Sequence, residues 1–257
     1  MAGRHGMFVR ITAAASLLLL TAGCSILNPA PVAAPADPYA NLRPTTAAVG
    51  VTMPALSDFQ HPWDVPTYIM RVTLFAGLPP MNGGVAFVGD SITDYGRWSE
   101  AYPNLRVRNF GIAGDTTVGL EHRLIQVIDA KPATIFLMIG TNDVEFGRSP
   151  EQIAANIGDI LDRLVAGLPN AKVYLESLMP RQPEFDAKVR AVNALLQKVA
   201  AKRGLTYIDL YTPFLAGGNR LDPRVTVDDL HPAGEGYARW RALIKDDVYP
   251  RALASGG

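Results

Sequence analysis

Apolar positions follow two alternating patterns between residues 85 and 247. Short apolar runs predict buried strands, and longer stretches with an apolar residue every three or four positions predict helices. The expected strands are 85–88, 105–110, 134–139, 173–178 and 206–210. The expected helices are 117–129, 149–164, 189–204 and 233–247. Residues 67–78 suit a helix or a strand leading into the domain, and the pattern alone does not decide between them.

The clearest helix signal begins at Ser149. Ser149 is a favourable N-cap, Pro150 suits the first turn, and Gln152 completes a capping box. The apolar residues that follow repeat at helical spacing and predict one buried face. The next helix is expected to end near Gly204, because glycine readily adopts the left-handed conformation that terminates helices.

Strands that alternate with helices predict a parallel sheet with right-handed crossovers and helices on both faces. We therefore expect a three-layer α/β/α domain with a five-stranded, mostly parallel sheet in a flavodoxin-like, doubly wound order. Ligands of such sheets bind beyond the carboxyl ends of the strands. Ser91, Gly114 and Asn142 follow the first, second and third expected strands, so this edge is the expected site.

The amino-terminal residues resemble an export signal rather than part of the fold. Arg4 and Arg10 precede an apolar stretch, residues 11–20, which is too short to span a membrane. The small residues before Cys24 resemble a bacterial lipoprotein signal, in which Cys24 becomes lipidated. We expect residues 1–23 to be removed and the protein to be lipid-anchored in the bacterial envelope, on the periplasmic side or at the outer membrane. An ordinary secretory signal, giving a soluble secreted or periplasmic protein, is the alternative.

Four segments describe the expected organisation of the chain. Residues 1–23 are the signal, and residues 24–66 are rich in proline and alanine, which predicts an extended tether. Residues 67–250 are expected to form the folded domain, and residues 251–257 a carboxyl-terminal tail.

Composition narrows the chemistry. The 257 residues suit one sizeable domain, and 24 Lys and Arg against 24 Asp and Glu give no reason to expect a nucleic-acid partner. The single cysteine, Cys24, excludes an intrachain disulfide and a cysteine nucleophile within the domain. The oligomeric state is left open.

Ser91, Asp228 and His231 are the candidate catalytic residues. An acyl-transfer serine needs a base and the base needs an orienting acid; Asp228 and His231 stand three positions apart. Ser91 alone could equally be a turn residue, and His231 alone could lie in a surface turn. Asp229 is a rival acid with poorer reach. The remaining histidines suit a catalytic base less well: His5 lies in the signal, His61 in the tether, and His122 on an expected solvent-facing position of a helix. Asp209 is expected to be a structural cap.

Two glycine-rich segments could stabilise an oxyanion. Residues 109–117 include Gly114, whose backbone N–H could face a ligand, and residues 140–143 include Asn142. A backbone N–H together with an Asn amide is suited to a developing oxyanion. Each segment alone would also fit an ordinary turn.

Together these segments resemble the SGNH (GDSL) hydrolase family over residues 84–245. The sequence Gly89-Asp90-Ser91-Ile92 differs from the eponymous motif by Ile92 in place of Leu. The resemblance implies Ser91 as nucleophile and, through its backbone N–H, as an oxyanion donor beside Gly114 and Asn142. It also implies the Asp228–His231 pair. No metal or organic cofactor is implied.

The resulting expectation is hydrolysis of short-chain acyl or O-acetyl esters, with a small acyl ester or an acetylated glycan as substrate. The alternatives are a lipid acyl hydrolase of the lysophospholipase or thioesterase type, an acyltransferase acting on envelope carbohydrate, and a non-enzymatic binding lipoprotein, which would not need the whole residue set. Several residues after the site segments are candidates for lining the pocket. They are Tyr95, Arg97, Trp98, Phe146, Arg148, Met179 and Arg181.

Overall fold

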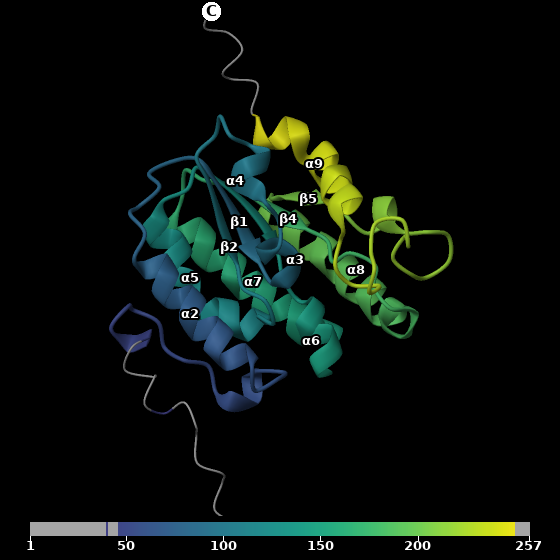
Figure 1. Cartoon of the computed structure of the whole chain (residues 1–257), viewed down its shortest axis with the longest axis horizontal. Helices are drawn as coiled ribbons and strands as arrows, with labels where there is room; N and C mark the ends of the chain where they lie inside the picture. The colour runs from purple at the N-terminus through teal and green to yellow at the C-terminus, as the bar shows by residue number, and fades with distance from the viewer. Residues whose placement is uncertain (1–39, 41–45, 250–257) are drawn as a thin grey trace, which may run out of the picture. The chain divides into compact units, whose positions relative to one another are not determined.

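A single parallel sheet organises the computed structural model, which describes residue 40 and residues 46–249. Its strand order is β2-β1-β3-β4-β5, and every neighbouring pair is parallel. The strands are β1 Val85–Gly89, β2 Val107–Gly111, β3 Thr134–Met138, β4 Lys172–Glu176 and β5 Thr206–Ile208. The expected five-stranded, three-layer fold is confirmed (Figure 1).

Helices connect these strands and cover both faces of the sheet (Figure 1). They are α2 Asp64–Ala76, α3 Ser91–Asp94, α4 Trp98–Ala101, α5 Thr117–Ala130, α6 Thr141–Phe146, α7 Pro150–Gly167, α8 Asp186–Arg203 and α9 Gly234–Val248. Short 3-10 turns lie at η2 Leu56–Asp58, η3 Pro183–Phe185 and η4 Thr212–Phe214. Residues 67–76 of the segment 67–78, for which the pattern allows a helix or a strand, therefore belong to the helix α2, which ends at Ala76. None of the helices within the described part of the chain is long and apolar enough to cross a membrane.

Local sequence signals account for several helix ends. The Ser149 side chain accepts a hydrogen bond from the Gln152 N–H, the Gln152 side chain accepts one from the Ser149 N–H, and Pro150 occupies the first turn of α7. Gly204 ends α8 in the left-handed conformation with φ 65°. Both features were predicted, because caps depend on residues adjacent in sequence.

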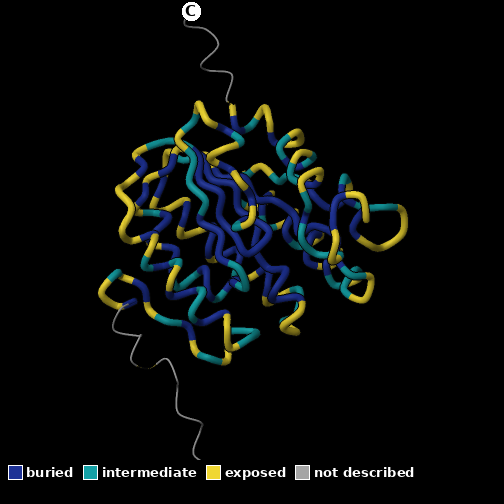
Figure 2. The backbone as a smooth tube through the Cα atoms, viewed as in Figure 1, coloured by how far each residue is buried: buried dark blue, intermediate teal, exposed yellow. Residues whose placement is uncertain are grey.

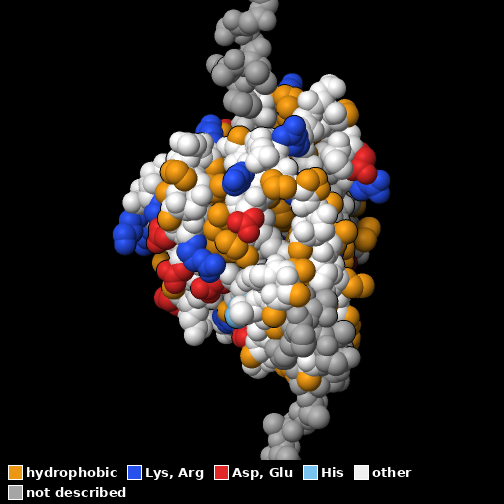
Figure 3. Space-filling view, turned by 90° about the vertical axis from the view of Figure 1, so that its left-hand side faces the viewer, with side chains coloured by type: hydrophobic (Ala, Val, Ile, Leu, Met, Phe, Trp, Pro, Cys, Tyr) orange, Lys and Arg blue, Asp and Glu red, His pale blue; other side chains and the backbone are white. Residues whose placement is uncertain are grey.

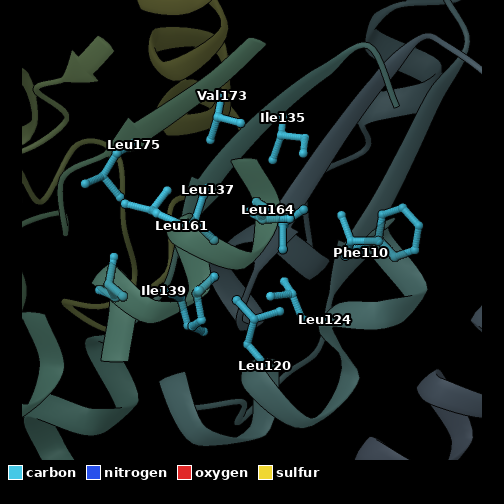
Figure 4. Packing of buried hydrophobic residues seen from close by; sticks show 14 of the residues in the cluster. Phe110, Leu120, Leu124, Ile135, Leu137, Ile139, Leu161, Leu164, Val173 and Leu175 are labelled. Carbon is cyan, nitrogen blue, oxygen red and sulfur yellow. The ribbon is translucent and has the colours of Figure 1, made fainter. Parts of the chain in front are cut away.

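Alternation along the strands divides the core into two clusters. In β1, Ala86 and Val88 face the cluster formed with α2, α5, α7 and α8, whereas Val85 and Phe87 face the cluster formed with α4 and α9. This follows from the two-residue period of side chains in a strand. Figure 2 shows the burial of the central strands β1 and β3, and Figure 4 shows the first cluster at close range.

The predicted tether is wrong for its described carboxyl-terminal part. Val51 is fully buried in the first core cluster, and Met53 and Phe59 pack against that cluster. Asp58 pairs with Arg148 at 3.2 Å. Prolines interrupt any regular apolar period here, so the sequence pattern does not reveal that isolated apolar residues reach the core. The predicted signal peptide, Cys24 and the tail lie outside the described residues.

Charged side chains of both signs are interspersed on the molecular face drawn in Figure 3. This distribution matches the equal totals of basic and acidic residues in the sequence. That face therefore carries no extended basic patch of the type that binds nucleic acids.

Candidate active site

Ser91 lies at the carboxyl end of β1, where the chain turns sharply into the short helix α3. Asp90 caps this helix through a hydrogen bond from the Ile92 N–H to its side chain. Gly89 is needed at the turn, because a Cβ there would lie 2.2 Å from the Met138 carbonyl oxygen. The turn therefore holds Ser91, which is 5% exposed, at the edge of the sheet.

Ser91, His231 and Asp228 form a continuous hydrogen-bonded chain. The Ser91 Oγ lies 2.9 Å from His231 Nε2, and His231 Nδ1 lies 2.7 Å from Asp228 Oδ2. The other carboxylate oxygen of Asp228 accepts hydrogen bonds from the Leu230 and His231 backbone N–H groups. The loop thus fixes the carboxylate, and the carboxylate orients the imidazole towards the serine. This geometry suits general-base activation of a serine nucleophile.

Hydrogen bonding determines the charge of Asp228. Burial alone would raise the pKa of its carboxyl group, but hydrogen bonds from the His231 ring and from backbone N–H groups outweigh that effect and hold the pKa at about 2. Asp228 therefore stays ionised throughout the neutral range. The rival Asp229 pairs with Arg220 at 2.7 Å, so the structure places the other acid of the dipeptide next to the imidazole.

Gly114 and Asn142 line the same cleft as Ser91. Gly114 has φ 79°, and a Cβ there would meet the Asp64 carboxylate at 2.5 Å, so both conformation and space require glycine. Asn142 donates one amide hydrogen to the Asp115 carbonyl at 2.8 Å, which leaves its second amide hydrogen for a ligand. Within the described residues, no protein group accepts a hydrogen bond from the Gly114 N–H. These groups can serve as oxyanion donors.

A buried ion pair joins the first two site segments. Arg123 Nε lies 2.7 Å from Asp115 Oδ2, both side chains are almost fully buried, and Arg123 also donates to the Gly89 carbonyl at 3.0 Å. Because the Asp115 backbone carbonyl accepts from Asn142, this one arginine links the nucleophile turn to both oxyanion segments. Removing one partner of such a pair typically costs about 3–5 kcal/mol.

Sequence reasoning missed this role of Arg123. The residue lies between Leu120 and Val127 at helical spacing, and both of these are fully buried. A charged residue on an apolar helix face was the available signal. His122, by contrast, lies beside Thr52, with the Thr52 Oγ1 3.0 Å from its Nδ1.

Asp143 and Arg148 attach the third segment to its surroundings. The Asp143 carboxylate accepts from the Thr117 N–H at 2.9 Å and the Thr117 hydroxyl at 2.6 Å, which fixes the start of α5. Arg148 pairs with Asp143 at 3.1 Å and also with Asp58. The Asp143 carboxylate therefore has a structural role, whereas the neighbouring Asn142 lines the cleft. Nothing in the sequence pattern distinguishes these two roles.

Asp90 is a fully buried carboxyl group next to the nucleophile. Burial raises its pKa to about 7, although the hydrogen bond from the Ile92 N–H opposes this rise. Its Oδ2 atom has no hydrogen-bond partner among the described residues. From the neighbouring strand β2, Asn109 donates to the carbonyls of Thr93, Asp94 and Gly96 and holds the end of α3.

The seven candidates for lining the pocket lie in different environments. Tyr95 lines the cleft, and its ring centroid lies 5.2 Å from that of His231. Trp98 and Met179 belong to the second core cluster. The other four do not line the cleft and make ion-pair or cation–π contacts: Arg97 with Glu100, Arg181 with Glu145, and Arg148 with Phe146. Asp209 was predicted to be a structural cap. Its carboxylate accepts from the N–H groups of Tyr211 and Thr212 at the start of the 3-10 turn η4, whose N-cap position is Tyr211.

The cleft has a volume of about 350 Å³ and combines the predicted residues with an unexpected wall. Besides Ser91, His231 and the oxyanion residues, it is lined by Gln60, His61, Trp63, Asp64, Thr67, Tyr95, Ala113, Glu145 and Leu230. The sequence pattern places residues 60–66 in the tether and gives no indication that they reach the site.

Asn142→Ala is expected to lower kcat for an activated acetyl ester by about 10²–10³-fold, the usual loss for one oxyanion donor. Steady-state hydrolysis of nitrophenyl acetate measures the effect. Asn170→Ala is the matched control, since Asn170 is exposed in the turn before β4. An Asn142→Ala enzyme with more than half of the original kcat would exclude the amide from the oxyanion hole.

Comparisons with known proteins agree with this geometry. A model of the GDSL-like Lipase/Acylhydrolase family matches residues 87–239, a range that contains the triad, Gly114 and Asn142. The platelet-activating factor acetylhydrolase IB subunit alpha2 of Rattus norvegicus is 32% identical over 165 residues, covering 60% of this chain and 71% of that protein. The alpha1 subunit of Homo sapiens is 28% identical, covering 60% of this chain and 70% of that protein.

Solved structures show the same architecture. A GDSL-like lipase from Bacteroides thetaiotaomicron superimposes with a TM-score of 0.63 and 27% identity, covering 70% of this chain and 96% of that chain. An acetyl xylan esterase shares the fold with a TM-score of 0.58 and 22% identity, covering 64% of this chain and 98% of that chain.

Proposed function

The chain belongs to the GDSL-like lipase/acylhydrolase family, and on that premise we propose that it is a serine hydrolase of short-chain acyl or O-acetyl esters. The observation that carries this proposal is the hydrogen-bonded chain from Ser91 through His231 to Asp228, next to the donors of Gly114 and Asn142. A binding protein would not need this combination of nucleophile, base and oxyanion donors.

The geometry supports a two-step acyl-enzyme mechanism. His231 Nε2 takes the proton of the Ser91 hydroxyl as Oγ attacks the ester carbonyl, and the negative oxygen is held by the Ser91 and Gly114 N–H groups and the Asn142 amide. Collapse of this intermediate breaks the acyl–oxygen bond, and His231 donates its proton to the departing alcohol. Water then attacks the acyl-enzyme with His231 again as base, which releases the carboxylic acid and restores Ser91.

The small size of the acyl group is supported by the shape of the cleft. Its volume of about 350 Å³ is shared by the acyl and alcohol portions, and its lining mixes polar residues with few aliphatic side chains. A long hydrocarbon chain would need a continuous apolar channel. The acetylhydrolase name of the mammalian relatives also supports a short acyl group.

We further propose that the protein acts in the bacterial envelope, tethered through a lipidated Cys24. This proposal rests on the basic and apolar composition of residues 1–20 and the small residues before Cys24.

A chain-length series of nitrophenyl esters tests the proposed acyl specificity. We expect kcat/KM of the purified protein to be highest between acetate and butyrate and at least about tenfold lower for decanoate, since unaccommodated methylene groups each cost about 1–3 kcal/mol. Initial rates below the solubility limit of each ester provide the measurement. A maximum at decanoate would contradict short-chain specificity, and the absence of hydrolysis for every ester would contradict the esterase itself.

A further inference from the structure

One wall of the active-site cleft comes from outside the region that matches the family. Gln60, His61, Trp63, Asp64 and Thr67 all line the cleft that contains Ser91, whereas the family match begins at residue 87. This wall therefore lies outside the range that the family model matches. Cleft residues outside the catalytic set are suited to selecting the substrate, because Ser91, His231 and the oxyanion donors already account for the chemistry.

The wall is firmly attached to the catalytic domain. Arg148 joins Asp58 at 3.2 Å to the buried Asp143 at 3.1 Å, so the segment before the wall is held to α6. At its other end, the buried Tyr68 hydroxyl donates to the Gly119 carbonyl at 2.8 Å, which ties α2 to α5. The wall is thus preorganised relative to the oxyanion donors, which reduces the entropy lost when a ligand binds.

An exposed aromatic surface lies on this wall. The rings of His61 and Trp63 stack with centroids 4.4 Å apart and an angle of 16° between planes. Trp63 is nevertheless 65% exposed. A large aromatic ring that is exposed at the lining of a cleft is a platform for a flat, partly apolar ligand face. The C–H face of a pyranose ring has this character.

The polar groups around the platform accept hydrogen bonds and carry negative charge. The Asp64 carboxylate lies beside Gly114, and its Oδ2 accepts from the His61 N–H at 2.9 Å. Glu145 contributes a second carboxylate, held by Arg181 at 2.5 Å. No lysine or arginine is among the described residues that line the cleft. This combination favours a neutral ligand rich in hydroxyl donors and disfavours a phosphate group.

We propose that residues 60–67 form the subsite for the alcohol portion of the ester and that this alcohol is a neutral sugar, an inference that rests on the ester hydrolysis proposed above. The sugar ring stacks on Trp63, and its hydroxyl groups donate to Asp64 and Glu145. The acyl–oxygen bond breaks as Ser91 takes the acyl group, and the sugar oxygen leaves with the proton from His231. Water then releases the acid.

Substitution of Trp63 tests the subsite with two acetyl esters that differ only in the alcohol. Acetylated xylo-oligosaccharide carries a sugar, and ethyl acetate carries an alcohol too small to reach an aromatic platform. We expect Trp63→Ala to lower the ratio of kcat/KM for the sugar ester to that for ethyl acetate by about tenfold, mainly through KM, because stacking is worth about 0.5–1.5 kcal/mol and 1.4 kcal/mol corresponds to tenfold. Trp63→Phe should restore part of the ratio. Acetate release measures both reactions.

Met70→Ala is the matched control. Met70 is 63% exposed on the same helix and does not line the cleft. This variant should therefore leave both rates within about twofold of the original, as is usual for exposed positions. A loss equal to that of Trp63→Ala would indicate a general effect on the helix and would overturn the subsite.

The possible outcomes distinguish failure of the proposed sugar subsite from failure of the proposed esterase activity. If the wild-type protein hydrolyses neither ester, the proposed function itself fails. If it hydrolyses ethyl acetate but Trp63→Ala leaves the ratio unchanged, the sugar subsite fails and the esterase stands. A short-chain phosphatidylcholine provides a third arm: if it is hydrolysed faster than the sugar ester and depends more strongly on Trp63, the wall serves a lipid alcohol and the proposal of a neutral sugar is overturned.

Discussion

Ser91→Ala is expected to lower kcat for nitrophenyl acetate by about 10⁴–10⁶-fold, as removal of the nucleophile of a catalytic triad does. The reason is that Ser91 Oγ, 2.9 Å from His231 Nε2, is the only hydroxyl positioned by the imidazole in the described structure. Without it, no acyl-enzyme forms, and the oxyanion donors can assist only direct attack by water. Steady-state rates, with enzyme concentration raised for the variant, measure the loss.

The control for this substitution is Ser99→Ala. Ser99 is an exposed serine of α4 whose hydroxyl donates to the neighbouring Glu100. The Ser99→Ala variant should keep essentially full activity. The melting temperature of Ser91→Ala should stay close to that of the wild type, because removal of one hydroxyl leaves the Asp90 cap of α3 in place. Full esterase activity in Ser91→Ala would exclude the serine mechanism.

Asp228→Asn should lower kcat by about 10⁴-fold, as a reversed imidazole tautomer does in other triads. Oδ1 of Asp228 accepts from the Leu230 and His231 N–H groups, so an Asn keeps these bonds only with its oxygen at that position. The amide NH₂ then faces His231 Nδ1, which must become an acceptor. Nε2 consequently carries the proton and cannot take one from Ser91.

Asp229→Asn is the matched control, because it makes the same chemical change one residue away. Asp229 pairs with Arg220 on the surface rather than with the imidazole. We expect its kcat to stay within about threefold of the wild type, since exposed ion pairs contribute about 0–1 kcal/mol. Equal losses in the two variants would mean that charge near the loop, rather than imidazole orientation, accounts for the effect. Measurement of kcat for the wild type and both variants at several pH values completes the comparison.

The parts of the fold predicted from sequence depend on residues near one another in the chain. The helix from Pro150 was predicted because its capping box and its apolar face lie within 18 residues. The strands of 134–138 and 172–176 are buried on both faces over most of their length and therefore contain continuous apolar runs. The alternation of strands with helices predicted a parallel sheet, and the carboxyl ends of its strands predicted the position of the site.

Contacts between distant segments account for what the sequence pattern did not show. Arg123 looks like an ordinary charged helix residue until Asp115 and the Gly89 carbonyl are placed against it. Trp63 lies in a proline-rich stretch without apolar periodicity, and only packing brings it to the cleft. Neither contact is encoded at a fixed spacing. The position of Arg123 on an apolar helix face indicates that its side chain needs a partner, but it does not identify Asp115.

By itself, the sequence indicated the type of chemistry, because the segments around Ser91, Gly114, Asn142 and the Asp228–His231 pair together resemble one hydrolase family. It also determined the layers of the fold, because strand and helix periods are local properties. Only the tertiary structure decided which carboxylate meets His231, how the buried Arg123 joins the site segments, and which residues before β1 line the cleft. The cleft depends on the packing of segments that are far apart in the chain, such as those of Ser91 and His231, which stand 140 positions apart.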